Sequence, residues 1–240
     1  DAGNGIFVAE QGGASYTLLP DELRVEYDRG PLSEVAMSHV IGDHAIPLLL
    51  SCLPGCVLHG ALLATGSVSV AVLGASGAGK STAAAAWVAA GRAFSGDDWF
   101  RVVGRAEKAI SVPSHPSLRL SSESAELAGL RPEGARAFRA VRGRNWWQFP
   151  GAGGAFCGRE RRLAGMVVIE RGGYKSRLEA ETLGAQGAFV ALLSSIRIPL
   201  TRNVELWRRQ LEGLCLLSER LRFVRVRIPE GAEGLRSLVR

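Results

Sequence analysis

A loop of small residues that ends in lysine and serine is the part of this sequence whose residue types could do chemistry. Residues 74–81 read G-A-S-G-A-G-K-S and match the pattern G-x-x-x-x-G-K-[ST]. Glycines let a backbone turn tightly and bring its N–H groups up to phosphate oxygens. Lys80 can reach the β- and γ-phosphates, and the Ser81 hydroxyl can bind a magnesium ion. The pattern predicts a nucleoside triphosphate site formed by Gly74, Ala75, Ser76, Gly77, Ala78, Gly79, Lys80, Ser81 and Thr82.

The elements on both sides of this loop are those that must position it. Residues 68–73 are apolar and rich in valine, which is typical of a buried strand. The alanine run after Lys80 favours a helix, with Gly91 placed as its C-cap. A helix that begins at the loop adds the positive end of its dipole to the phosphate site. A glycine-rich turn that binds no ligand is the alternative, and the matching strand and helix argue against it.

Two adjacent carboxylates, Asp97 and Asp98, end the short strand that we expect after this helix. Phosphoryl transfer requires metal charge near the phosphates and a carboxylate that accepts the proton of the acceptor hydroxyl. Neighbouring side chains on a strand point to opposite sides, so one aspartate can face the metal and acceptor while the other supports the site. The residues alone do not decide which is which. A simple Gly-Asp-Asp turn remains the alternative.

Composition favours a folded protein that binds anions. The chain has 240 residues, 47% hydrophobic and 22% charged, and a formal net charge of +6; its positively charged residues are almost all arginine. This positive charge fits either phosphate-bearing ligands or acidic partner molecules. The sequence has no recognition motif for DNA or RNA, which argues against nucleic acid as the ligand. Pro47, Pro54 and His59 interrupt the longest apolar stretch, so we expect no membrane segment. With no secretion signal and four cysteines in no metal-binding pattern, we expect a cytoplasmic protein.

The order of the remaining elements predicts a single α/β domain over residues 1–240. Residues 1–45 read as a β-rich segment packed on the rest, and Asp43 is placed to cap a helix that runs to about Leu53. Residues 56–63 read as one strand that forms a hairpin with the strand before the loop. Further along, we expect a strand at 163–170, helices at 187–194 and 204–217, and a closing strand at 221–228.

Residues 58–100 resemble the catalytic core of the bacterial HPr serine kinase/phosphorylase family. They read LHGALLATGSVSVAVLGASGAGKSTAAAAWVAAGRAFSGDDWF. The family's elements fall in the same register here without an insertion: His59-Gly60, the loop from Gly74 to Ser81, Gly91-Arg92, and Asp97-Asp98. The resemblance implies an α/β fold that contains a P-loop and is HPr kinase-like (similar to PEP carboxykinase), with a small N-terminal β-ribbon.

The resemblance also implies roles for single residues. Asp98 is then the general base that deprotonates a serine hydroxyl, with Asp97 and Ser81 at the magnesium ion. His59 assists near the acceptor, although a polar residue of a strand without such a role is the alternative. Residues 198–203 are similar to the family's Pro-Val-x-x-Gly-Arg-Asn element, so that Arg202 stabilises the transferred phosphate.

Two departures from the family bear on the substrate. The family has a Glu-Val/Ile-Arg-Gly-Leu-Gly-Ile segment whose glutamate contributes to the magnesium site, and residues 112–120 contain no clear counterpart of it. The sequence also has no counterpart of the large N-terminal domain of full-length members. Shorter relatives of this kind resemble kinases found with ribosomally made peptides, notably lasso peptides. The resemblance thus implies a kinase that depends on ATP and Mg²⁺ and acts on a serine of a peptide or protein. HPr, a small-molecule acceptor, a nucleotide-binding regulator without turnover, and a homo-oligomeric state all stay open.

Overall fold

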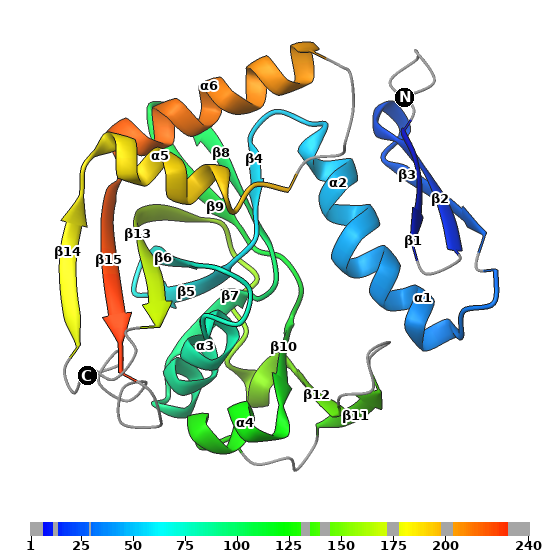
Figure 1. Ribbon diagram of the computed structural model, residues 1–240, viewed down its shortest axis with the longest axis horizontal. Helices are drawn as coiled ribbons and strands as arrows, with labels where there is room; N and C mark the ends of the chain where they lie inside the picture. The colour runs from blue at the N-terminus through cyan, green and yellow to red at the C-terminus, as the bar shows by residue number, and fades with distance from the viewer. Residues whose placement is uncertain are drawn as a thin grey trace.

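The chain folds around a curled nine-stranded sheet with helices on both faces (Figure 1). The computed structural model describes residues 7–11, 14–28, 30–130, 135–139, 145–171, 178–197 and 204–229. Within the sheet, strands follow the order β4-β8-β9-β13-β6-β5-β7, while β15 pairs with β13 and β14 pairs with β15. Strands β6, β13 and β15 run parallel, whereas the other pairings are antiparallel. The fold is therefore mixed α/β, as expected.

The strands of this sheet are short except for one. They are β4 (Cys56–Leu58), β5 (Ala61–Thr65), β6 (Val68–Leu73), β7 (Ala93–Gly96), β8 (Phe100–Arg105), β9 (Lys108–Val112), β13 (Arg161–Arg171), β14 (Glu179–Leu183) and β15 (Arg222–Ile228). Because β13 is the longest, it pairs with three neighbours, β9, β6 and β15. It therefore joins the antiparallel and parallel parts of the sheet.

Two hydrophobic clusters cover the two faces of the sheet. On one face lie α3 (Lys80–Ala89) and α4 (Ser122–Ala128), and on the other α5 (Ala185–Leu193) and α6 (Val204–Arg220) (Figure 1). The alternation of β6 follows this division, because Val72 packs with the alanines of α3 while Ala71 and Leu73 pack with α5 and α6. In the described part of the chain, none of the helices is both long and apolar enough to span a membrane.

The N-terminal segment forms a unit of its own that packs against the rest. Strands β1 (Phe7–Gln11), β2 (Ala14–Leu19) and β3 (Arg24–Asp28) make an antiparallel sheet, with the 3-10 helix η1 (Pro20–Glu22) between the last two. Helix α1 (Glu34–Val40) then continues through the π-helix η2 (Ile41–Ala45) into α2 (Ile46–Ser51). Leu206 of α6 joins the core of this unit, so the unit is attached to the main sheet through α6.

A third sheet lies beside α3 and α4. It has the order β10-β12-β11 and consists of β10 (Ser117–Ser121), β12 (Asn145–Pro150) and β11 (Arg136–Arg139), followed by the 3-10 helix η3 (Gly151–Gly154). Leu118 and Leu120 of β10 are buried against α3 and α4. Because side chains alternate along a strand, Arg119 between them points the other way, toward η2 and Asp98.

Two details of the sequence prediction are wrong. Asp43 does not cap a helix, because η2 continues from α1 into α2 and its carboxylate binds Arg119 instead. The strand predicted at 56–63 is two strands, β4 paired with β8 and β5 paired with β6. The two strands are separated by His59 and Gly60. A Cβ atom at position 60 would lie 2.5 Å from the Val72 carbonyl oxygen. The hairpin of β5 and β6 is present as expected.

Candidate active site

The phosphate loop lies at the carboxyl end of β6, beside the end of β13. Strand β6, residues 74–79 and helix α3 follow one another in the expected order. A Cβ atom at Gly74 would lie 2.5 Å from the carbonyl oxygen of Ile169, so only glycine lets the loop pass this close to β13. Gly79, just before α3, has a φ of 103°, which also favours glycine. The loop is therefore shaped by its glycines to turn directly into the helix.

Lys80 folds back over the loop that precedes it. Its side chain is buried, and Nζ donates to the carbonyl oxygens of Gly74 at 2.9 Å and Ala75 at 3.0 Å. Burial lowers the pKa of Lys80, and the carboxylates of Asp97 and Asp98 act in the opposite direction. The ammonium group is thus held at the loop, where phosphate oxygens can replace the two carbonyls. Thr82 is buried in the first turn of α3, where backbone N–H groups favour phosphate oxygens.

Ser81 and Asp97 are joined by a hydrogen bond. The Ser81 hydroxyl donates to Asp97 Oδ1 at 2.9 Å, which links the first turn of α3 to the end of β7. A hydroxyl and a carboxylate oxygen are ligands that Mg²⁺ prefers, and Mg²⁺ commonly takes one or two protein ligands together with phosphates and water. No cluster of three or more His, Cys, Asp or Glu side chains arranged for a metal exists among the described residues. Ser81 and Asp97 therefore fit a magnesium ion whose remaining ligands are nucleotide phosphates and water.

The two aspartates differ in exposure and contacts. Asp97 is buried, at 2% exposure, whereas the side chain of Asp98 is 31% exposed. Burial, followed by the negative charge of Asp98, raises the pKa of Asp97 to about 7. The pKa of Asp98 is also raised by burial, and the Arg119 guanidinium, 3.2 Å from its Oδ2, opposes that shift. Asp97 is therefore the inner carboxylate beside Ser81, and Asp98 is the outer one.

Asp98 holds an uncommon backbone conformation. Its φ is 67°, in the left-handed region that few residues other than glycine adopt. The next residue, Trp99, is buried and donates from Nε1 to the carbonyl oxygen of Gly42 at 2.9 Å. Strained backbone of this kind persists where the surroundings fix it, and it concentrates at functional sites.

His59 lies between Arg197 and the main chain of Asp98. A guanidinium group can only donate hydrogen bonds, so Arg197 Nη2 is the donor and His59 Nδ1 the acceptor of the bond of 2.9 Å between them. Since Nδ1 accepts, the proton of the neutral ring is on Nε2, and the imidazole also hydrogen-bonds the backbone of Asp98. Burial, followed by the charges of Lys80 and Arg197, lowers the pKa of His59 to about 4. At neutral pH this histidine is therefore uncharged.

Further titratable residues around Asp98 were not assigned to the site by the sequence analysis. They are Asp43 of η2, His115, Arg119 of β10 and Arg197. Arg119 lies in residues 112–120, where the sequence analysis found no clear counterpart of the family's glutamate segment. Asp43 reads as a helix cap and Arg119 as one polar residue of an alternating strand, so no local pattern marks either of them as part of this site. Arg202 lies outside the described residues.

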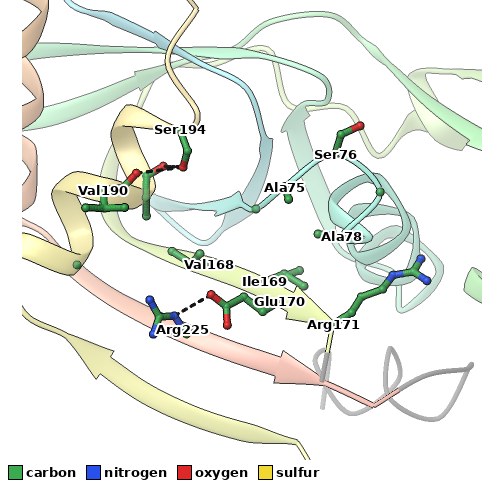
Figure 2. A pocket seen from close by; sticks show the side chains of 14 residues that line it. Ala75, Ser76, Ala78, Val168, Ile169, Glu170, Arg171, Val190, Ser194 and Arg225 are labelled. Carbon is green, nitrogen blue, oxygen red and sulfur yellow. Dashed lines mark hydrogen bonds and ion pairs between the residues drawn. The ribbon is translucent and has the colours of Figure 1, made fainter. Parts of the chain in front are cut away.

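A cavity of about 450 Å³ adjoins the outer side of the phosphate loop. Figure 2 shows Ala75 and Ser76 on one side of it and α5, with Val190 and Ser194, on the other. The end of β13 lies below, where Glu170 is paired with Arg225 at 3.0 Å. The cavity has the size of a small-molecule pocket, with apolar walls and a few polar groups.

Comparisons with known proteins assign no family to the chain. No family model matches the chain, and no curated protein matches it. Among solved structures, the HPr(Ser) kinase/phosphatase from Coxiella burnetii is similar over 65% of this chain and 87% of its own length, with 13% identity and a TM-score of 0.35. A similarity at this TM-score carries no argument about function.

Proposed function

We propose that this chain is a phosphotransferase that depends on ATP and Mg²⁺ and moves the γ-phosphate to a serine hydroxyl of a peptide or protein. One observation carries the proposal. Ser81, at the start of the phosphate-loop helix, is bonded to the inner aspartate Asp97, while the partly exposed Asp98 follows directly. This arrangement has separate groups for the metal and for the acceptor. The acceptor class is taken from the sequence resemblance, which includes precursors of lasso peptides.

The loop and the adjacent cavity suit the two ends of a nucleotide. Backbone N–H groups of the loop and the N-terminus of α3 favour phosphate oxygens. Lys80 exchanges its carbonyl partners Gly74 and Ala75 for the β- and γ-phosphates. The nucleoside then lies in the cavity beside α5, where Val190 offers an apolar wall and Glu170 can accept hydrogen bonds from ribose hydroxyls.

Ser81 and Asp97 are the groups that would hold Mg²⁺. The ion neutralises charge on the phosphates when it is bound. Asp97 contributes a carboxylate that burial disfavours in its charged form, and a nearby cation relieves that cost. The hydrogen bond from Ser81 keeps both oxygens at one point of the site.

Asp98 is the group that accepts the proton in the transfer. Its carboxylate takes the proton of the serine hydroxyl as the serine oxygen forms a bond to the γ-phosphorus. The bond from that phosphorus to the bridging oxygen breaks, and ADP leaves with the electron pair. The raised pKa of Asp98 makes it a stronger base than an exposed aspartate. His59, being neutral, orients Arg197 and the Asp98 main chain and does not itself carry the proton.

The test is transfer of label from γ-³²P-ATP to matched acceptors. One acceptor is a set of serine-containing peptides, the second the same peptides with alanine in place of serine, and the third free serine and glycerol. We expect label in the serine peptides only, and only with Mg²⁺ present. Label in the small molecules makes the chain a small-molecule kinase. Tight ATP binding with no labelled product under any condition contradicts the proposed phosphotransferase.

A further inference from the structure

Arg119 contacts three carboxylates around the proposed site. Both Nη atoms donate to the carboxylate of Asp43, and Nη2 lies 3.2 Å from Oδ2 of Asp98. The backbone N–H of Arg119 donates to Asp97 Oδ2 at 3.3 Å. Only 14% of the Arg119 side chain is exposed. One residue of β10 therefore connects the two aspartates of the site to a carboxylate from the N-terminal unit.

Asp43, which binds Arg119, lies in the π-helix η2. Turns of this kind are rare within helices and are frequent at functional sites. Gly42, the residue before Asp43, accepts the hydrogen bond of the Trp99 indole, and Trp99 directly follows Asp98. Two contacts thus join η2 to the neighbourhood of Asp98, one through Trp99 and one through Arg119.

The shape of the guanidinium explains what these contacts do. An arginine that binds a carboxylate through two parallel N–H groups is fixed in orientation as well as in position. Asp43 binds Arg119 in this way, so the remaining contact of Nη2 sets where the Asp98 carboxylate lies. Asp98 needs such support, since its own backbone is in an unfavourable conformation.

We propose that Arg119 is a positioning residue that fixes the Asp98 carboxylate for proton abstraction, and that Asp43 of the N-terminal unit holds Arg119 in place. The N-terminal unit is then a part of the active site. The catalytic consequence rests on the proposed function, whereas the seating of η2 against Asp98 does not.

A spectroscopic test addresses the seating without any activity. The indole N–H resonance of Trp99 is followed in the ¹⁵N-labelled full chain and is assigned with Trp99→Phe. We expect it to shift in Asp43→Asn and in Arg119→Met, with no additional shift in the double variant. An unchanged resonance in both single variants overturns the proposal, even if the chain proves to have no kinase activity. Arg119→Lys, which keeps the charge, replaces Arg119→Met if that variant does not fold.

A kinetic test addresses the positioning of Asp98. With a serine peptide as acceptor, we expect Arg119→Met to lower kcat about 100-fold and Asp43→Asn to lower it about 10-fold, while the Kd for ATP stays within about twofold, because small misplacements of reacting groups slow chemistry without weakening binding. The double variant should be no slower than Arg119→Met alone, and Arg119→Lys should fall between Arg119→Met and the wild type.

Three kinetic results overturn the proposal. The first is a wild-type kcat in Asp43→Asn. The second is a double variant whose loss equals the product of the two single losses, since Asp43 then acts independently of Arg119. The third is an ATP affinity that falls as much as kcat, which makes Arg119 a nucleotide ligand. The matched control is the exposed pair of Arg208 and Glu205, joined by hydrogen bonds of 2.6 and 2.9 Å. Arg208→Met should leave kcat unchanged.

Discussion

The nucleotide side and the acceptor side of the site are built in different ways. The nucleotide side is one continuous stretch, from β6 through the loop into α3, with Asp97 only 16 residues from Ser81. On the acceptor side, Arg119 binds Asp43 across 76 residues, and His59 binds Arg197 across 138 residues. A contiguous stretch positions its groups through its own backbone, whereas distant residues meet only after the sheet and the N-terminal unit have assembled. Substitutions on the two sides should therefore separate binding from chemistry.

Asp98→Asn tests the acceptor side and should have the largest effect. Asparagine has nearly the same shape but cannot accept the proton, so we expect kcat to fall about 10³-fold, within the range of general-base catalysis. The Kd for ATP should stay within about twofold. Steady-state kinetics and calorimetric titration with ATP measure the two quantities. Asp21→Asn, at an exposed position of η1, is the control. Normal turnover with weakened ATP binding would contradict the assignment of the base.

Lys80→Ala tests the nucleotide side and should affect both quantities. The ammonium contacts phosphate in the ground state and in the transition state, so its loss weakens binding and slows transfer together. Hydrogen bonds to charged groups contribute about 1.5–3 kcal/mol, which corresponds to a Kd that rises about 10- to 100-fold. Lys108→Ala, at an exposed position of β9, is the matched control. An unchanged Kd in Lys80→Ala would show that the loop does not bind the nucleotide.

Asp97→Asn should raise the stability of the fold and weaken the binding of Mg²⁺. The pKa of Asp97 is about 7 in the fold, above its ordinary value of 3.8. As the pH rises from about 4 through 7, the unfolded chain loses this proton more readily than the folded chain, so the folded state loses stability. The amide has no proton to lose. We therefore expect Asp97→Asn without ligands to melt a few degrees above the wild type at pH 8, and to need more Mg²⁺ for transfer. Calorimetry measures the melting temperature, and a lower value would contradict the burial argument.

His59→Gln should have the smallest effect, on the pH dependence of stability. The pKa of His59 is about 4 in the fold, below its ordinary value of 6.5. As the pH falls from about 6.5 to 4, this histidine becomes protonated in the unfolded chain but stays neutral in the folded chain. The free energy of unfolding therefore falls by at most about 1.4 kcal/mol per pH unit because of this group. Glutamine removes this contribution. Urea unfolding at pH 8 and pH 5 should show a smaller decline in the variant, and an equal decline would mean that His59 does not stay neutral.

The difference between the two sides also explains what the sequence could predict. The strand, loop and helix around Lys80 and Ser81 follow from residue types within a short window, and the structure has them in that order. The same window predicts that Asp97 and Asp98 lie close to the loop. Residue types alone do not distinguish them, because the distinction comes from the Ser81 hydroxyl on one and Arg119 beside the other.

The acceptor side could not be predicted, since no local pattern marks it. Asp43 has the residue type and the setting of a helix cap, and only the contact with Arg119 reveals another role. The break at His59 was missed because residues 56–63 are uniformly apolar around it, and such a run does not show where pairing changes from one neighbour to another. The role of Asp43 and the division of residues 56–63 into two strands both depend on contacts with other elements of the fold, which a local pattern does not show.

The most direct test of the account is a crystal structure of the chain with Mg²⁺ and an ATP analogue that cannot be hydrolysed. We expect the triphosphate in the loop with Lys80 on its terminal phosphates and the metal on the oxygen of Ser81. The carboxylate of Asp98 should face the γ-phosphate, with room for a hydroxyl between them. A triphosphate bound elsewhere, or an Asp98 turned away from it, would contradict the central claim.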